Sequence, residues 1–195
     1  MVRLAAIVSF ASLALLSFAT PIKRTQAKIE QDLNIVDALV TTWDKAVNGF
    51  KGNALQATAS VFIAFSDYFS NYIKQALHAT ALLLDAAINQ ATRDTQNTAP
   101  LATDMDALQI LAVFENASPT LIGGLTQISE KASSFAAIRG GTAVVEQDIR
   151  SLSTSTAALL SAISAITPAE AVPQATQFAV TLNDAYADTL TNLAK

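Results

Sequence analysis

The sequence contains no cysteine and a single histidine, His78, among its 195 residues. Without cysteine the chain forms no disulfide, no haem–thiolate centre and no zinc–thiolate site, so the folded protein must rely on packing alone. With one histidine, a zinc site would have to be built from carboxylates, which is unusual. These absences remove the usual signs of a disulfide scaffold and of a metalloenzyme.

The sequence also lacks the patterns that accompany catalysis. A catalytic triad would need His78 to meet a serine and an aspartate across helices, and no G-x-S-x-G motif supports one. Asp104 and Asp106 fit the favourable first turn of a helix better than a paired-carboxylate site. The glycine pairs at 123–124 and 140–141 lack the strand–loop–helix setting of a phosphate-binding loop. We therefore predict that the protein is not an enzyme and has no catalytic residue, metal or cofactor.

Basic residues are few, and several lie near the N-terminus. Residues 1–19 show Arg3, an apolar run over 4–16 and small residues at 17 and 19, which is typical of a secretory signal peptide. The run is shorter than the ~20 apolar residues of a membrane-spanning helix, so we expect no transmembrane segment. Residues 20–24 end in the dibasic pair Lys23-Arg24, which is either the processing site of a short pro-segment or a solvated pair.

Removal of residues 1–24 takes three of the twelve Lys and Arg residues. Nine then remain against sixteen Asp and Glu residues, a formal charge of −7. An acidic protein of this kind has no electrostatic footprint for nucleic acid and little attraction to anionic lipid. We expect a secreted protein, extracellular or associated with the cell wall, with no nucleic-acid partner.

Alternation typical of strands is scarce, and a 4-3 spacing of apolar residues is clear in two places. The first seam consists of Ile29, Leu33, Val36, Val40, Trp43, Val47 and Phe50; the second consists of Val145, Ile149, Leu152, Thr156, Leu159, Ile163 and Ile166. Such seams indicate amphipathic helices that pack against other helices. We predict an all-α fold in which residues 25–195 form a single-domain antiparallel bundle of about five helices.

Turn residues suggest where these helices begin and end. We expect a second helix over about 54–93, with a break near 78–80. Thr103 or Asp104 caps a third helix, which Pro119 could kink, and this helix runs on to Ile138. Gly140-Gly141 makes the turn into the fourth helix, and Pro168 and Pro173 separate the fourth from the fifth.

An aromatic stretch, "VFIAFSDYFSNYI" at 61–73, holds five of the thirteen aromatic residues. At ~100° per residue its apolar side chains share one broad face of a helix. Because the neighbouring helices are rich in Ala, Ser and Thr, this face either fills the core or borders an apolar void that accepts a ligand. The residues alone leave both interpretations open.

Two segments, "IVDALVTTWDKAVNGFKGN" and "TDMDALQILAVFENASPTLIGGLTQISEKASSFAAIRGGTAVVEQDIRSLSTSTAALLSAISAITP", resemble a family of secreted fungal proteins. This family comprises hydrophobic surface-binding protein A (HsbA) and the related antigenic cell-wall galactomannoproteins. The resemblance implies a helical bundle and non-catalytic binding of hydrophobic material, such as a fatty acid or a hydrophobic polymer surface. It also implies secreted lipolytic or polyester-degrading enzymes as partners. The second helix is more aromatic than is usual in the family, and the Ser/Thr-rich stalk of some wall-bound relatives is absent.

We therefore expect a secreted protein that binds lipids or hydrophobic surfaces; the alternative is a structural or antigenic cell-wall mannoprotein without a small ligand. The sequon at Asn116 is a candidate glycosylation site, and Pro119 directly after the sequon disfavours its use. The candidate walls of a lipid cavity are Trp43, Phe62, Phe65, Phe69, Leu111, Phe114 and Phe135. No cation for a lipid carboxylate stands out, and Lys74 and Arg139 are better explained as solvated.

Overall fold

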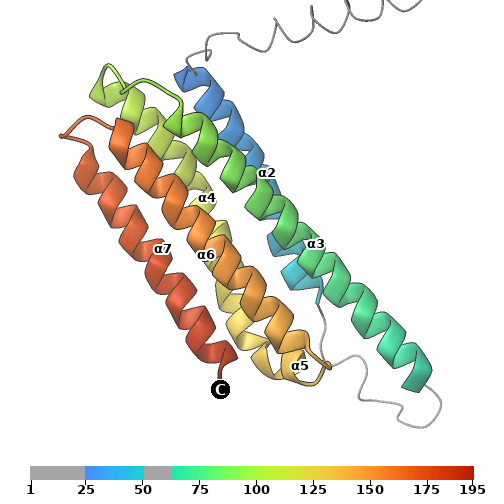
Figure 1. The fold of residues 1–195 in the computed structure, drawn as a ribbon. Coiled ribbons are helices and arrows are strands. Elements are labelled where there is room, and N and C mark those ends of the chain that lie inside the picture. The colour runs from blue at the N-terminus through green and yellow to red at the C-terminus, as the bar shows by residue number, and fades with distance from the viewer. Residues whose placement is uncertain (1–24, 51–62) are drawn as a thin grey trace, which may run out of the picture.

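The computed structural model describes residues 25–50 and 63–195, with the backbone alone described over 63–74. Its helices are α2 (Gln26–Gly49), α3 (Ile63–Gln96), α4 (Asp104–Glu130), α5 (Ala132–Ala136), α6 (Gly141–Ile166) and α7 (Val172–Leu193). Five of these are long and α5 is a short addition after α4 (Figure 1). The predicted all-α bundle of about five helices is confirmed. The predicted signal peptide and the Lys23-Arg24 pair lie outside the described residues.

The five long helices form a closed ring. Each long helix runs opposite to the long helix before it in the chain (Figure 1). In space, α2 packs against α3 and α4, α6 packs against α3 and α7, and α7 packs against α4. The order around the ring is therefore α2, α3, α6, α7 and α4, and helices that follow one another along the chain, such as α3 and α4, are not always neighbours. A ring of five helices has a central axis onto which all of them can direct side chains.

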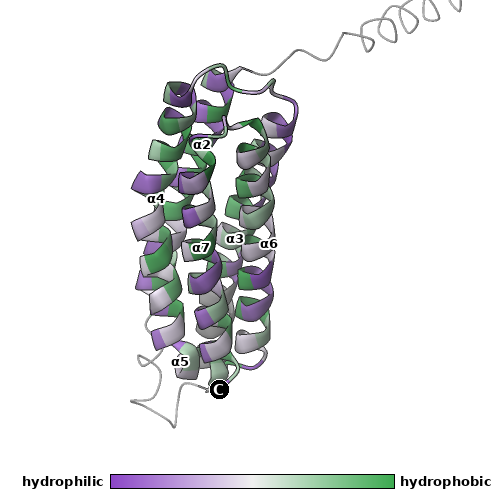
Figure 2. Cartoon of the chain, turned by 90° about the vertical axis from the view of Figure 1, so that its left-hand side faces the viewer, coloured by the Kyte–Doolittle hydropathy of each residue, from purple (hydrophilic) through white to green (hydrophobic). Residues whose placement is uncertain are grey.

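The two predicted seams supply much of the core. All seven residues of the seam in α2 and its C-cap are buried, as are all seven of the seam in α6. Hydrophilic residues occupy the opposite side of each helix, so apolar and polar residues alternate along the ribbons (Figure 2). Burial of one apolar stripe per helix is the expected driving force for a bundle without disulfides.

The second helix differs from the prediction, because α3 continues without a break through residues 78–80. The polar side chains at this point form hydrogen bonds without interrupting the helix. His78 Nδ1 lies 2.7 Å from Asp148 Oδ1 on α6, and Thr80 Oγ1 donates to the carbonyl of Leu77 at 2.8 Å. The predicted start near residue 54 lies outside the described residues.

The third helix begins as predicted but ends early. Of the two candidate caps, Thr103 caps α4: its hydroxyl accepts from the Asp106 N–H at 3.2 Å, and the Asp106 carboxylate accepts from the Thr103 N–H at 3.1 Å. The helix runs unbroken through Pro119 but stops at Glu130 instead of Ile138. Lys131 leaves the helical conformation (φ −96°, ψ 9°), and its ammonium group donates to the carbonyls of Val47 and Asn48 at the end of α2.

The predicted turn into the fourth helix is confirmed. Gly140 has a φ of +68°, a left-handed conformation that side chains disfavour and glycine adopts freely, and α6 begins at the next residue. Among the described residues, α6 is the one helix long and apolar enough to cross a membrane by length and composition. Half of that stretch is buried within the bundle, as in the core helix of a helical bundle.

Candidate functional site

A cavity lies at the axis of the ring, and all five long helices contribute to its wall. It is lined by Leu33, Val36, Val40, Ile88, Val113, Phe114, Ala117, Ser118, Leu121, Thr156, Leu159 and Leu182. The space open to the centre of a water molecule is about 20 Å³, which is room for one or two waters. Pockets that enclose drug-sized ligands measure about 300–1,000 Å³. A long acyl chain therefore enters this cavity only if the helices move apart.

The wall of this central cavity is apolar apart from two hydroxyl-bearing residues. The Ser118 hydroxyl donates to the carbonyl of Phe114, one turn earlier in α4, at 2.7 Å. The Thr156 hydroxyl lies 3.1 Å from the hydroxyl of Tyr186, which is 1% exposed. Burial raises the pKa of Tyr186 to about 12, so that this phenol stays protonated at any physiological pH. No charged residue belongs to the wall as described.

A second, smaller cavity of about 10 Å³ lies near α5. Its lining includes Phe50 and Phe135, whose rings stack with their centroids 4.5 Å apart, and the His78–Asp148 pair. Burial raises the pKa of the Asp148 carboxyl, although its hydrogen bond with His78 opposes this effect. The histidine that the sequence leaves unassigned therefore joins α3 to α6 across a mostly apolar space.

The structure separates the predicted wall residues into three groups. Phe114 lines the central cavity and Phe135 lines the smaller one. Trp43 and Leu111 are buried in the core and belong to neither lining. Phe62 lies outside the described residues, and the side chains of Phe65 and Phe69 lie in the part of α3 for which the structure gives the backbone only. The role of the aromatic stretch thus stays a prediction.

The candidate glycosylation site lies on the outer side of α4. Asn116 is exposed, whereas Ser118 of the same sequon is buried against the central cavity. The asparagine is thus accessible in the folded bundle, and its modification stays a prediction.

Several wall residues were not identified as such from the sequence. Leu33, Val36, Val40, Thr156 and Leu159 belong to the predicted seams, but a seam alone does not show which of its residues face an unfilled space. Thr156 carried the clearest signal, because it is the one polar residue in either seam. Ile88 and Leu182 are recognised as lining residues only from the ring order, which brings α3 and α7 to the same axis.

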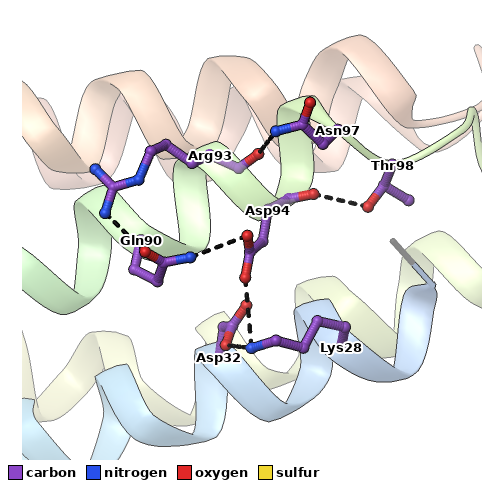
Figure 3. A network of polar contacts seen from close by, with 7 residues as sticks. All are labelled: Lys28, Asp32, Gln90, Arg93, Asp94, Asn97 and Thr98. Carbon is purple, nitrogen blue, oxygen red and sulfur yellow. Dashed lines mark hydrogen bonds and ion pairs between the residues drawn. The ribbon is translucent and has the colours of Figure 1, made fainter. Parts of the chain in front are cut away.

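A polar cluster joins α2 to α3 (Figure 3). Lys28 pairs with Asp32 one turn later and lies 3.4 Å from Asp94 on α3, and Gln90 donates to Asp94 at 3.0 Å. Asp32 and Asp94 are almost wholly buried. Burial raises the pKa of Asp32, and its hydrogen bond raises the pKa of Lys28. Among the described residues no group of His, Cys, Asp and Glu could hold a metal ion, so this cluster is best explained as a link between two helices.

The family model of hydrophobic surface binding protein A, HsbA, matches residues 26–165. The chain belongs to the HsbA family. This assignment confirms the resemblance seen in the sequence. No functionally curated protein matches the sequence.

Solved structures with the same fold come from similar proteins in complex with fatty acids. Afmp4p in complex with palmitic acid has a TM-score of 0.72 at 22% identity, with 87% of this chain and 99% of that chain covered. Ligand-binding domain 1 of the Penicillium marneffei MP1 protein, complexed with arachidonic acids, has a TM-score of 0.71 at 12% identity, with 87% and 99% covered. Ligand-binding domain 2 of that protein, also with arachidonic acids, has a TM-score of 0.71 at 16% identity, with 90% and 98% covered. At these identities the likeness shows a shared fold.

Proposed function

We propose that this HsbA-family protein binds a single-chain lipid, such as a fatty acid, inside its ring of helices. The observation that carries the proposal is the central cavity, whose apolar wall draws on all five long helices. Family membership supports a ligand that is hydrophobic, and the structures of similar fold that hold palmitic or arachidonic acid support a lipid. In the described part of the chain, nothing resembles a catalytic centre, and the protein acts by binding alone.

Binding requires the small central cavity to widen. Each methylene group moved from water into an apolar site contributes about 0.8 kcal/mol, which a long chain accumulates over many groups. Against this gain stand the ordering of the chain and the loss of contacts between the helices it separates. No disulfide ties the helices together, so the ring can part along its apolar seams. In the widened state we place Phe114, Leu111, Trp43 and Phe135 against the chain, together with the aromatic face of Phe62, Phe65 and Phe69.

The protein acts outside the cell in this proposal. Residues 1–19 form the signal peptide, and the pro-segment of residues 20–24 is removed after Lys23-Arg24. The mature domain from residue 25 carries its lipid in the medium or at the cell wall. There it would encounter hydrophobic polymers and the secreted enzymes that degrade lipids or polyesters.

Adsorption to a hydrophobic surface is a second candidate, favoured by large apolar side chains that the fold leaves exposed. These are Ile35, Leu82, Leu83, Met105, Leu108 and Val180. They are distributed over α2, α3, α4 and α7, so adsorption through them would use several outer faces. Cavity binding predicts saturable binding near one ligand per protein, whereas adsorption predicts neither saturation at that ratio nor dependence on the cavity wall.

Titration of the protein with a fluorescent fatty acid tests the proposal. Ala117→Leu adds side-chain volume to the wall of the central cavity, and Ala112→Leu makes the same change on the exposed side of α4. We expect saturation near stoichiometry in the unmodified protein and in Ala112→Leu, with binding at least tenfold weaker in Ala117→Leu, the order of affinity lost for ~1.4 kcal/mol. Equal binding by the two variants, or no saturation in the unmodified protein, would contradict the cavity.

A further inference from the structure

The hydroxyl pair of Thr156 and Tyr186 has one hydrogen more than it uses. Each hydroxyl can donate one hydrogen bond and accept two. The two oxygens lie 3.1 Å apart, so one hydroxyl donates to the other and the second hydrogen needs a different acceptor. No described residue accepts this hydrogen at hydrogen-bond distance, and the carboxyl group of Asp85 on α3, with its Oδ1 buried, acts on the Tyr186 hydroxyl through its charge alone. Thr156 is 4% exposed and Tyr186 is 1% exposed, so bulk water does not supply one either.

The position of Thr156 allows this spare donor to reach the central cavity. Thr156 belongs to the cavity wall, whereas Tyr186 lies behind it on α7 and is not part of the lining. Burial holds the Tyr186 phenol protonated, with a pKa of about 12, so it remains available to donate to Thr156. When Tyr186 donates, the Thr156 hydrogen is free to point into the cavity. The other hydroxyl of the wall, Ser118, already donates within its own helix at 2.7 Å.

The charge of the wall limits the kind of group that can meet this donor. None of the described lining residues is charged, so an ionised carboxylate at this point would have no cation beside it. A buried charge without a partner is strongly disfavoured, and a buried carboxyl group takes up a proton instead. An uncharged oxygen can accept a hydrogen bond from Thr156 without that penalty.

We infer that the Thr156–Tyr186 pair is an anchor for the uncharged oxygen head of a single-chain lipid: an alcohol, an ester or a protonated acid. The inference rests on the proposed function, since it needs a lipid in the cavity. It adds a preferred head group and a residue, Thr156, that sets the preference. Tyr186 acts through Thr156 and is a positioning residue.

Competition between lipids of one chain length tests the anchor. Tetradecane, tetradecanol and tetradecanoic acid displace an apolar fluorescent probe from the full chain and from two variants. Thr156→Val removes the hydroxyl and keeps the branched shape. Thr189→Val is the matched control: Thr189 is 2% exposed on α7, donates to the Ala185 carbonyl at 2.8 Å and to the Leu125 carbonyl of α4 at 3.3 Å, and does not line the cavity.

We expect Thr156→Val to weaken the binding of tetradecanol about tenfold, which is the effect of one lost hydrogen bond. The same variant should change the affinity for tetradecane by no more than about twofold. Thr189→Val should change neither of these affinities. In the unmodified chain, tetradecanoic acid should bind more tightly as the pH falls toward the pKa of its carboxyl group. Equal tetradecanol affinities of Thr156→Val and the unmodified chain, or a tetradecanoic acid affinity that rises with pH, would overturn the anchor alone. If none of the three lipids, tetradecane included, displaces the probe, the proposed function is overturned and the anchor with it.

Discussion

At the residue scale, Trp43 on α2 packs closely against Gly124 on α4. A Cβ atom at position 124 would lie 2.5 Å from Trp43 Cζ3, a distance that real Cβ contacts essentially never show. The adjacent Gly123 has nothing within 4 Å of the same position. Two neighbouring glycines in one helix therefore have different reasons to be there, and only Gly124 makes room for a neighbour.

The two glycines give a matched pair of variants. Gly124→Ala should lower the free energy of unfolding by about 1–3 kcal/mol, because the indole ring or a helix must shift. Gly123→Ala should raise it by about 0.5–1 kcal/mol, because alanine favours the helix and meets no neighbour. Urea unfolding measures both, and equal changes in the two variants would show that Trp43 does not rest on α4 in this way.

The buried carboxyl group of Asp32 predicts an effect of pH. Its pKa is raised by burial, against the opposing hydrogen bond from Lys28 and with Asp94 of α3 beside it. A raised pKa means that the folded protein binds the proton more tightly than the unfolded chain does. The stability that this proton contributes is complete below the unfolded pKa of about 3.9 and is lost as the pH rises through the folded pKa.

Asp32→Asn removes this titration and keeps an oxygen that can accept from Lys28. As the pH falls from 7, the unmodified protein should gain unfolding free energy relative to the variant, by roughly 1.4 kcal/mol for each unit by which the pKa is raised. Urea unfolding between pH 4 and 7.5 gives both curves. A relative loss of stability by the unmodified protein on acidification would show that Asp32 is favoured as the carboxylate.

At the scale of the element, the helices follow local rules that the sequence displays. The seams of α2 and α6 appear as 4-3 spacings, and Gly140 marks a turn because its φ is positive. The early end of α4 could not be read in this way. It depends on Lys131, whose ammonium group binds carbonyls of a helix more than eighty residues earlier in the chain. Likewise, the continuity of α3 through His78 depends on a partner on α6.

The capping box of α4 gives a test at this scale. Thr103→Ala removes the hydroxyl that accepts from the Asp106 N–H and should cost about 1 kcal/mol of unfolding free energy. Thr126→Ala is the control in the same helix: its exposed side chain bonds only to the carbonyl one turn back, and alanine should stabilise the helix by a few tenths of a kcal/mol. Thermal or urea unfolding that ranks the two variants in the opposite order would argue against the cap.

At the scale of the whole molecule, the ring order determines the cavity. The sequence predicted five helices but did not predict that α2, α3, α6, α7 and α4 close a ring in that order. Phe114 was among the wall residues predicted from the sequence. Ile88 and Leu182 were not, because their place in the wall depends on the ring order. A void forms where side chains from several helices leave space unfilled, so the residue pattern of one helix does not predict it.

Enlargement of the cavity links stability to binding. Leu182→Ala removes a side chain that is 1% exposed and lines the cavity, and should lower the unfolding free energy by about 2–5 kcal/mol. Leu83→Ala, at an exposed position on α3, should change it by less than about 0.5 kcal/mol. If the lipid occupies this space, a saturating fatty acid should recover more stability in Leu182→Ala than in Leu83→Ala. Equal recovery in thermal unfolding would contradict a shared location.

The central claim is that the lipid lies inside the ring rather than on its surface. The most direct test is NMR of the methyl-labelled protein with a fatty acid that carries a nitroxide on its chain, because the nitroxide broadens nearby signals. We predict that at one equivalent of lipid the methyl signals of Val36, Ile88 and Leu159 broaden more strongly than those of the exposed Ile35, Leu82 and Leu83. Stronger broadening of the exposed methyl signals than of the interior ones would contradict the cavity and place the lipid on the outer surface.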